Sequence, residues 1–419
     1  MTTNITKESG FTLVELLVAL LIGLLLAAAI VTIYLGSQRT FRAAQGVSRS
    51  QEATRFAVHF LKTDIRQAGY LGCSEGVAKQ SFLDQANPNY NASFDSSIFG
   101  WEFEGTSSGD TYILNYDVES GDSSDAEIET ARGNNSSDDP GMWDSQFIST
   151  SQEDLVPTVL PQIILDLEPL DGSDIVSVTI AEPLVVGDGG TQPGQPVFVS
   201  ALPSLREFNL DTIDINGNTI IPDIPNGSII SVGDCSSVDT FQNTATDGDD
   251  FFSIDPAADL SPGNALTGLF EWQKKWDESA SLFTSKTSVY FVGTGASGVP
   301  SLFRYTSACG LIDDVGSDPG CDVSVVELVE GVENMQVMYG EDSDDDGVPN
   351  QLLPADEVSG FDNVVSVELG ILVRSVETSS DIDNTTVYVL AGNTSIDPPD
   401  DRFQRFVSNT TIRLHNQGL

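Results

Sequence analysis

The chain has 419 residues and carries 63 acidic against 18 basic side chains, for a formal net charge of −45. This length allows one large domain or two modest ones. The charge is uneven, because residues 1–73 hold 7 of the basic side chains and only 4 of the acidic ones. A surface this negative repels phosphate backbones, which argues against nucleic-acid binding, and simple solvation accounts for most of the charge.

The first element in chain order is an apolar segment that follows a short polar leader, residues 1–10. Phe11–Leu35 contains 25 residues, and Glu15 is its only charge. At about 1.5 Å per residue the segment is longer than the roughly 30 Å hydrocarbon core of a bilayer. A secretory signal peptide has a shorter apolar run that ends at its cleavage site, whereas here the polar leader comes first. The segment therefore predicts a membrane-spanning helix.

The junction between leader and apolar segment, GFTLVE at residues 10–15, resembles the cleavage and methylation signal of type IV prepilins and pseudopilins. The resemblance implies that a prepilin peptidase cuts between Gly10 and Phe11 and methylates the new amino terminus. It also implies that Glu15, whose carboxylate is costly in hydrocarbon without a partner, pairs with the amino terminus of a neighbouring subunit during assembly. A local alternative, compatible with this pairing, is a capping box between Thr12 and Glu15.

Apolar residues at helical spacing continue beyond the membrane segment to a turn at Gly72 and Cys73. We therefore predict one helix over residues 11–73, membrane-spanning over 11–35 and amphipathic over 36–70, whose second half packs on a folded domain. Its apolar positions include Phe41, Phe56 and Leu61. Six basic residues between positions 39 and 66 favour the opposite membrane orientation by the positive-inside rule, so a cytoplasmic N-terminus rests on the prepilin resemblance.

Residues 74–419 are predicted to form a β-rich domain outside the membrane. Alternating apolar residues predict strands, most clearly over Val364–Arg374, and acidic or Gly- and Ser-rich stretches such as Glu119–Pro140 predict loops. The expected fold class is α+β, with a long N-terminal helix packed on an antiparallel β-sheet with long acidic loops. The other predicted strands are Tyr112–Val118, Asp174–Ile180, Ser228–Cys235, Ser288–Val292, Glu333–Tyr339 and Thr410–Leu414.

Four further segments look like the PilW-type minor pilins: Gln51–Cys73, Ser228–Ser237, Pro300–Tyr305 and Val326–Gly347. This resemblance implies a minor type IV pilin that primes pilus assembly and sits at or near the pilus tip. The implied partners are other minor and major pilins and a tip adhesin, in a pilus that serves adhesion and motility. The implied location is the inner membrane, crossed once with the N-terminus in the cytoplasm and the domain in the periplasm, and later the filament on the cell surface.

Two other classes of protein remain as alternatives. One is a minor pseudopilin of type II secretion, which has the same kind of anchor. The other is a membrane-tethered periplasmic enzyme or binding protein, although a mere tether needs no cleavage site between Gly10 and Phe11.

The four cysteines, Cys73, Cys235, Cys309 and Cys321, form no CxxC pair and have no histidine nearby in sequence, which argues against a zinc site. In the oxidising compartment beyond the inner membrane, two disulfides are expected. We pair Cys73 with Cys235 and Cys309 with Cys321, and the two other connectivities remain alternatives.

No catalytic constellation stands out, and the chain is not expected to be an enzyme. Gly293–Gly298 matches the dinucleotide-binding pattern GxGxxG, but a strand pattern follows where a helix is required, so a hairpin turn is predicted. His59 and His415 are the only histidines, and no GxSxG elbow accompanies them. Trp272 and Trp276 are expected to pack in the core rather than at an interface with another subunit.

An acidic segment, residues 342–350, has the ligand spacing of a calcium-binding loop. Gly347 stands at the sixth position, where such loops bend. The twelfth position is Leu353 rather than Glu, which excludes a complete EF-hand and leaves Asp356 or Glu357 as substitutes. A solvated acidic turn is the alternative to the Ca²⁺ site that we predict. The candidate ligands are Asp342, Asp344, Asp346, the Val348 carbonyl and Asn350.

Overall fold

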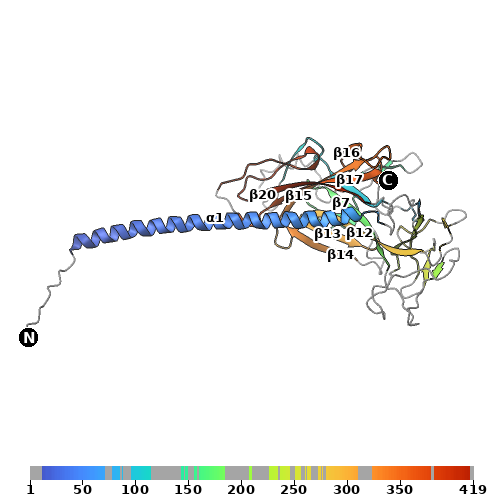
Figure 1. Cartoon of the computed structure of the whole chain (residues 1–419), viewed down its shortest axis with the longest axis horizontal. Helices are drawn as coiled ribbons and strands as arrows, with labels where there is room; N and C mark the ends of the chain where they lie inside the picture. The colour runs from blue at the N-terminus through green and yellow to red at the C-terminus, as the bar shows by residue number, and fades with distance from the viewer. Residues whose placement is uncertain are drawn as a thin grey trace, which may run out of the picture.

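The computed structural model describes a long helix and much of a β-rich domain (Figure 1). Gly10 and Phe11 of the predicted processing site lie outside the described residues. The described residues are 12–70, 78–84, 87, 96–114, 143–145, 147–149, 155–157, 160–184, 207–209, 226–234, 236–245, 251–255, 260, 262–265, 272–274, 276, 280–309, 323–378 and 382–415.

A single helix, α1 (Leu13–Gln67), forms the N-terminal part of the molecule. Its 55 residues correspond to about 82 Å of helix. In Figure 1 the first half of α1 projects as a bare rod, and the second half lies along the domain. The long N-terminal helix of the predicted fold class is therefore present.

The second half of α1 packs on the domain through a face of small and aliphatic side chains. The buried residues of this face are Ser50, Ala57, Leu61 and Ile65. Spacings of seven and four residues keep them on one side of the helix, where they contact strands of both large sheets. Phe41 and Phe56 are not part of this face. They are 69% and 50% exposed because they point to other sides of the helix.

A nine-stranded sheet forms the larger part of the domain. The long strand β12 at its centre pairs with β7, β9 and β13, and β13 pairs in turn with β14. All pairs are antiparallel except β1 with β10. The strands are β1 (Ala78–Ser81), β2 (Ile98–Phe103), β4 (Trp143–Asp144), β7 (Ile175–Pro183), β9 (Ile229–Gly233), β10 (Ser237–Gln242), β12 (Ser281–Thr294), β13 (Pro300–Ser307) and β14 (Val323–Glu330).

A four-stranded antiparallel sheet with the order β16-β15-β17-β20 lies against the helix. Its central strand β17 has the bounds that the sequence predicted, because apolar residues alternate along its whole length. The strands are β15 (Val332–Glu341), β16 (Gln351–Leu353), β17 (Val364–Arg374) and β20 (Arg405–Arg413).

Smaller elements complete the described fold. A three-stranded sheet has the order β18-β19-β3, and its β19 and β3 are parallel. The sequence predicted an antiparallel sheet, and the described β structure is mostly but not wholly antiparallel. The elements are β3 (Thr111–Ile113), β5 (Phe147–Ser149), β6 (Leu155–Pro157), β8 (Glu207–Asn209), β11 (Phe251–Ser253), β18 (Tyr388–Val389), β19 (Ser395–Asp397), and the short helices α3 (Gln162–Leu165), η3 (Phe361–Asn363) and η4 (Ala391–Asn393).

One hydrophobic core joins α1 to both large sheets. It includes Leu61 of α1, Trp101 of β2, Tyr339 of β15 and Leu369 of β17, all fully or almost fully buried. Burying side chains of this size stabilises a fold by about 1.5–3 kcal/mol each, so the helix and the two sheets form one packed unit. A second cluster around Trp276 lies on the β9 and β10 side of the large sheet and confirms the predicted core role of this residue.

The GxGxxG match is a hairpin, as predicted. It connects β12 to β13, and the Gly295 N–H donates to the Val299 carbonyl at 2.9 Å. Gly298 has a φ of +75°, a conformation that favours glycine. The glycines therefore serve a turn.

Candidate functional site

The helix α1 begins at a reciprocal capping box between Thr12 and Glu15. The Glu15 N–H donates to Thr12 Oγ1 at 3.3 Å, and Glu15 Oε2 accepts from the Thr12 N–H and hydroxyl, both at 3.0 Å. These bonds satisfy donors that a helix start would leave unpaired. Both bonds to the carboxylate end on Oε2, so Glu15 Oε1 has no hydrogen bond from the described residues. The carboxylate therefore caps the helix through one of its two oxygens.

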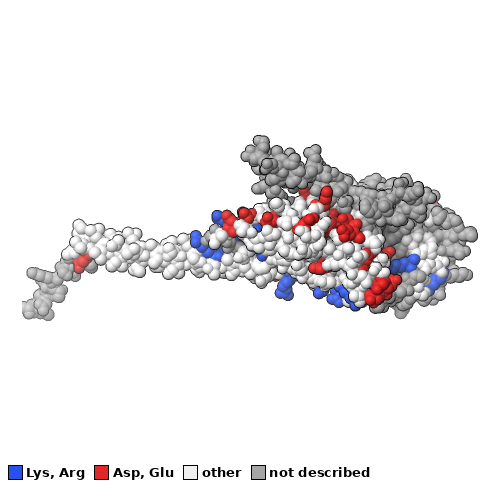
Figure 2. All heavy atoms as spheres, turned by 90° about the horizontal axis from the view of Figure 1, so that it is seen from above, with Lys and Arg blue, Asp and Glu red and all other residues white. Residues whose placement is uncertain are grey.

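The first part of α1, up to Leu35, presents apolar side chains on every side. Its large apolar residues are between 46% exposed, at Leu35, and 76% exposed, at Leu13. The rod is uncharged apart from the carboxylate at its start (Figure 2). This stretch is long and apolar enough to cross a membrane.

A polar cluster holds the second half of α1 on the large sheet. The Tyr290 hydroxyl of β12 donates a hydrogen bond to Asp64 of α1, and Arg304 of β13 lies 3.8 Å from the same carboxylate. Burial and then the negative charge of Asp64 raise the pKa of Tyr290 above its usual value, so the hydroxyl stays protonated and remains a donor. This partly buried contact fixes the helix in position on the sheet.

Two more contacts show how the four-stranded sheet runs along α1. Arg49 lies 3.9 Å from Glu377, just beyond the end of β17. Arg66 Nε donates to His415 Nε2 at 3.0 Å, just beyond the end of β20. Residue 49 is nearer to the apolar rod than residue 66. The end of the sheet at which β17 terminates is therefore proximal to the membrane segment, and the end near His415 is distal.

The acidic loop, residues 342–350, connects β15 to β16 at the distal end of this sheet. Carboxylate oxygens of Asp342, Asp344 and Asp346 all lie within 4.8 Å of one another. An Arg413 guanidinium N–H donates to the Gly347 carbonyl at 3.4 Å, which ties the loop to the end of β20. The structure therefore brings together the three carboxylates that the sequence proposed as ligands.

Backbone hydrogen bonds organise the loop around Asp342, which is only 3% exposed. Its carboxylate accepts from the N–H groups of Gly347 at 2.6 Å, Asp344 at 3.2 Å and Asp346 at 3.4 Å. Burial raises the pKa of Asp342, but these hydrogen bonds outweigh it and hold the pKa below its usual value. Gly347, with a φ of +79°, permits the bend. Asp342 is thus kept ionised, as a metal ligand must be.

The remaining candidate ligands have contacts of their own. Asn350 Oδ1 accepts from the Ser343 N–H at 2.6 Å, and its Nδ2 donates to Asp344 Oδ1 at 3.3 Å. The Val348 N–H donates to Asp346 Oδ1 at 2.8 Å. Burial first, and then negative charge that includes that of Asp356, raises the pKa values of Glu102 and Asp174. Asp356 is one of the two substitutes for the twelfth ligand. The donor set fits an oxygen-liganded cation, and the Ca²⁺ assignment stays a prediction.

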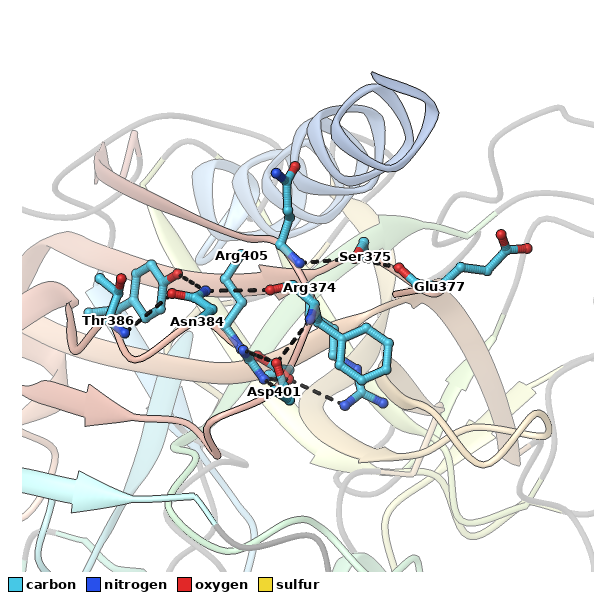
Figure 3. A network of polar contacts seen from close by, with 11 residues as sticks. Arg374, Ser375, Glu377, Asn384, Thr386, Asp401 and Arg405 are labelled. Carbon is cyan, nitrogen blue, oxygen red and sulfur yellow. Dashed lines mark hydrogen bonds and ion pairs between the residues drawn. The ribbon is translucent and has the colours of Figure 1, made fainter. Parts of the chain in front are cut away.

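A buried ion network closes the membrane-proximal end of the four-stranded sheet (Figure 3). Arg405 donates to Glu333 from Nε at 2.6 Å and to Asp401 from Nη1 and Nη2 at 2.7 and 2.6 Å. A second guanidinium, that of Arg374, lies 3.5 Å from Glu333 and 4.5 Å from the ring of Phe403. The network joins the second residue of β15, the first residue of β20 and the last residue of β17.

The structure describes one of the four cysteines. Cys309 is buried and disulfide-bonded. Cys73, Cys235 and Cys321 lie outside the described residues. The pairings Cys73 with Cys235 and Cys309 with Cys321 therefore stay predictions, which non-reducing peptide mapping can check.

Comparison with known protein families gives two matches. Residues 5–31 match the prokaryotic N-terminal methylation motif, and residues 289–416 match the family described as type IV pilus-assembly protein W. The chain therefore resembles type IV pilin-like proteins, with the methylation motif at its N-terminus and the PilW match in its C-terminal part. Neither the curated proteins nor the solved structures compared with the chain gave a match.

The PilW match of this pilin-like protein covers the whole four-stranded sheet, the acidic loop and the ion network. Two of the PilW-like segments found in the sequence, Pro300–Tyr305 and Val326–Gly347, fall inside the match, whereas Gln51–Cys73 and Ser228–Ser237 fall outside it. The methylation motif contains Gly10, Phe11 and Glu15. The N-terminal helix is therefore an inner-membrane anchor of the kind that a prepilin peptidase processes.

Sequence reasoning missed the buried charges of the pilin-like domain. Glu333 and Arg405 stand near the start of β15 and at the start of β20, and Glu102 lies inside β2. A charged residue at an inward-facing position of a strand is the signal that could have found them, because buried charges are nearly always paired.

Proposed function

We propose that this pilin-like protein is a minor type IV pilin that primes pilus assembly and occupies a position at or near the pilus tip. The observation that carries the proposal is the start of α1, where Glu15 caps the helix through Oε2 and leaves Oε1 without a described partner. A carboxylate in a low-dielectric setting gains most from a cation, and the methylated amino terminus of a neighbouring subunit is such a cation.

The position of the acidic loop supports a place near the tip. The loop lies at the membrane-distal end of the four-stranded sheet, the side that faces partners assembled earlier in a filament that grows from the membrane. Asp344 and Asp346 are exposed there, and Val348 beside them is 59% exposed. A polar surface with an exposed aliphatic side chain suits an interface with another protein, and the partners that we propose are other minor and major pilins and a tip adhesin.

The proposal includes a route through the cell. The N-terminus lies in the cytoplasm and the domain in the periplasm while α1 spans the inner membrane, and the subunit then enters the filament. The methylation motif supports this orientation, since the prepilin peptidase acts on a leader at the cytoplasmic face. No part of the proposed function requires catalysis.

The test of pairing compares Glu15→Ala with Thr12→Ala in a strain that lacks the native chain. Glu15→Ala should leave processing intact, with methylated Phe11 as the first residue by mass spectrometry, but should reduce the chain in sheared filaments at least tenfold. Thr12→Ala removes the cap and keeps the carboxylate, so this variant should still enter filaments. Normal incorporation of Glu15→Ala would reduce this residue to a helix cap.

Immunogold labelling of the native filament tests the position. Gold at one filament end supports a tip location, and gold along the whole length contradicts it. A mature chain that retains residues 1–10 would contradict the prepilin assignment altogether.

A further inference from the structure

Four exposed side chains form one face of α1 at the end of its apolar rod. Tyr34, Gln38, Phe41 and Arg42 follow the spacing i, i+4, i+7 and i+8, which places them on the same side of the helix. Gln38 Nε2 donates to the Tyr34 hydroxyl at 2.7 Å, and the two aromatic side chains are 60% and 69% exposed. This face, which we call the aromatic–basic face, combines two rings, an amide and a cation.

The rings of the aromatic–basic face point away from the side of α1 that packs on the domain. Phe41 precedes the buried Ser50 by nine residues, which is about 180° around a helix, whereas Arg42 lies about 80° from Ser50, on the flank of the helix. Arg42 is exposed, and no ion pair links it to the described residues. The described part of the domain therefore does not cover the two rings, which are open to an occupant outside it.

The height of the face on the helix matches the surface of a bilayer. From Leu13 to Leu35 the helix rises by about 33 Å, close to the roughly 30 Å thickness of the hydrocarbon core. From Tyr34 to Arg42 it rises by a further ~12 Å, through the boundary of the acyl chains and the headgroup layer. Figure 2 shows basic side chains gathered where the bare rod meets the domain. Tyrosine rings and arginine side chains are the groups that membrane interfaces accommodate best.

We propose that the aromatic–basic face binds the phospholipid surface at the outer end of the span, with Arg42 on headgroup phosphates and the rings of Tyr34 and Phe41 at the acyl-chain boundary. The proposal rests on the anchor and its orientation in the proposed function. Charge explains why such a contact is needed. Residues 74–419 hold 59 acidic and 11 basic side chains, so anionic lipids repel the domain, and a cation at its base offsets this repulsion.

The contact fixes the depth of the anchor and therefore of its first turn. Glu15 precedes Arg42 by 27 residues, about 40 Å along the helix, which is close to the full thickness of a bilayer. With Arg42 held at one surface, the Glu15 carboxylate lies at the edge of the hydrocarbon core, near the opposite interface. It is then at the height where a neighbouring amino terminus arrives.

The experiment measures depth in bilayers with the mature full-length chain. Gly36 has no heavy atom within 4 Å of where a Cβ would stand, so Gly36→Cys can carry a nitroxide label without disturbing a contact. Its depth is measured by power saturation with oxygen and a nickel chelate, in nanodiscs with and without phosphatidylglycerol. Arg42→Gln should shift the label by about 2 Å or more, roughly one residue of helix rise, and high salt should shift the unsubstituted chain in the same direction.

Lys62→Gln is the matched control, because it removes one positive charge about 30 Å further along the same helix and should leave the depth unchanged. An Arg42→Gln chain whose label keeps the depth of the unsubstituted chain in anionic bilayers overturns the proposal. So does an Arg42→Gln chain that keeps its depth but fails to enter filaments, since the face would then dock on a neighbouring subunit. A chain that does not insert into nanodiscs contradicts the membrane anchor itself. That outcome is distinct from an inserted chain whose label depth does not depend on Arg42, which contradicts the lipid contact alone.

Discussion

Two carboxyl groups lie side by side inside the domain, Glu102 of β2 and Asp174 just before β7, and they are 4% and 2% exposed. Asp174 accepts from the Phe103 N–H at 3.2 Å and from the Val337 N–H at 2.8 Å, and so connects the two large sheets. Burial raises the pKa of Asp174 to about 7. Burial and then the charge of Asp174 raise the pKa of Glu102 well above its usual value. The pair therefore retains protons near neutral pH.

These raised pKa values make the domain less stable as the pH rises. The folded carboxyl groups keep protons that the unfolded chain releases above pH ~4. The contribution of Asp174 to stability therefore falls as the pH rises from ~4 through about 7, and that of Glu102 goes on falling at higher pH. We expect the Tm of the soluble domain to be several degrees higher at pH 6 than at pH 8. Glu102→Gln keeps a donor toward Asp174 and no longer titrates, so the difference should shrink.

Glu104→Gln is the control for this measurement, because it removes one exposed carboxylate two residues further along. It should leave the pH dependence of the Tm unchanged. Equal pH dependence in the native domain and in Glu102→Gln would show that other groups cause it.

At the scale of elements, the ion network ties the ends of three strands together. Burial raises the pKa of Glu333, although Arg405 beside it opposes that effect by hydrogen bonding and charge. Both side chains of the Glu333–Arg405 pair are fully buried. Removing one partner of a buried pair leaves an uncompensated charge, which is far more costly than the loss of an exposed pair.

We therefore expect Arg405→Met to destabilise the domain by about 3–5 kcal/mol in denaturant titration. Arg402→Gln serves as the control, because Arg402 pairs with Asp383 at 3.1 Å where both side chains are 57% exposed. It should cost no more than ~1 kcal/mol. If the two variants were equally stable, the buried network would contribute no more than a surface pair.

The elements show what the sequence could predict. The long α1 and the bounds of β17 followed from hydrophobic periodicity, and the β12–β13 hairpin followed from its glycines. The parallel pairing of β3 with β19 could not be predicted, because it joins segments nearly 300 residues apart. The capping box of Thr12 and Glu15 was readable because it is local. Contacts between distant residues, such as Asp174 with Val337, depend on the packing of the two sheets.

At the scale of the whole molecule, a strongly acidic domain is joined to an uncharged rod (Figure 2). Asp342, Asp344, Asp345 and Asp346 concentrate this charge in one loop, where we expect mutual repulsion to weaken the turn and a bound cation to offset it. A domain this negative attracts cations everywhere, however, so stabilisation by salt alone does not identify a site. Only a difference in Ca²⁺ response between matched variants can identify the binding site.

The last prediction concerns Ca²⁺ at this loop. Ca²⁺ at 100 times its Kd should stabilise the soluble domain by about 2.7 kcal/mol and raise its Tm. The variant Asp344→Ala/Asp346→Ala should lose this response, because two of the three clustered carboxylates are gone. The control Asp110→Ala/Asp400→Ala removes two exposed carboxylates elsewhere and should keep it. All three proteins are melted in chelator, in millimolar Ca²⁺ and in millimolar Mg²⁺. Equal Ca²⁺ responses in all three would place any binding elsewhere, and no response in the native domain would leave the loop a solvated acidic turn.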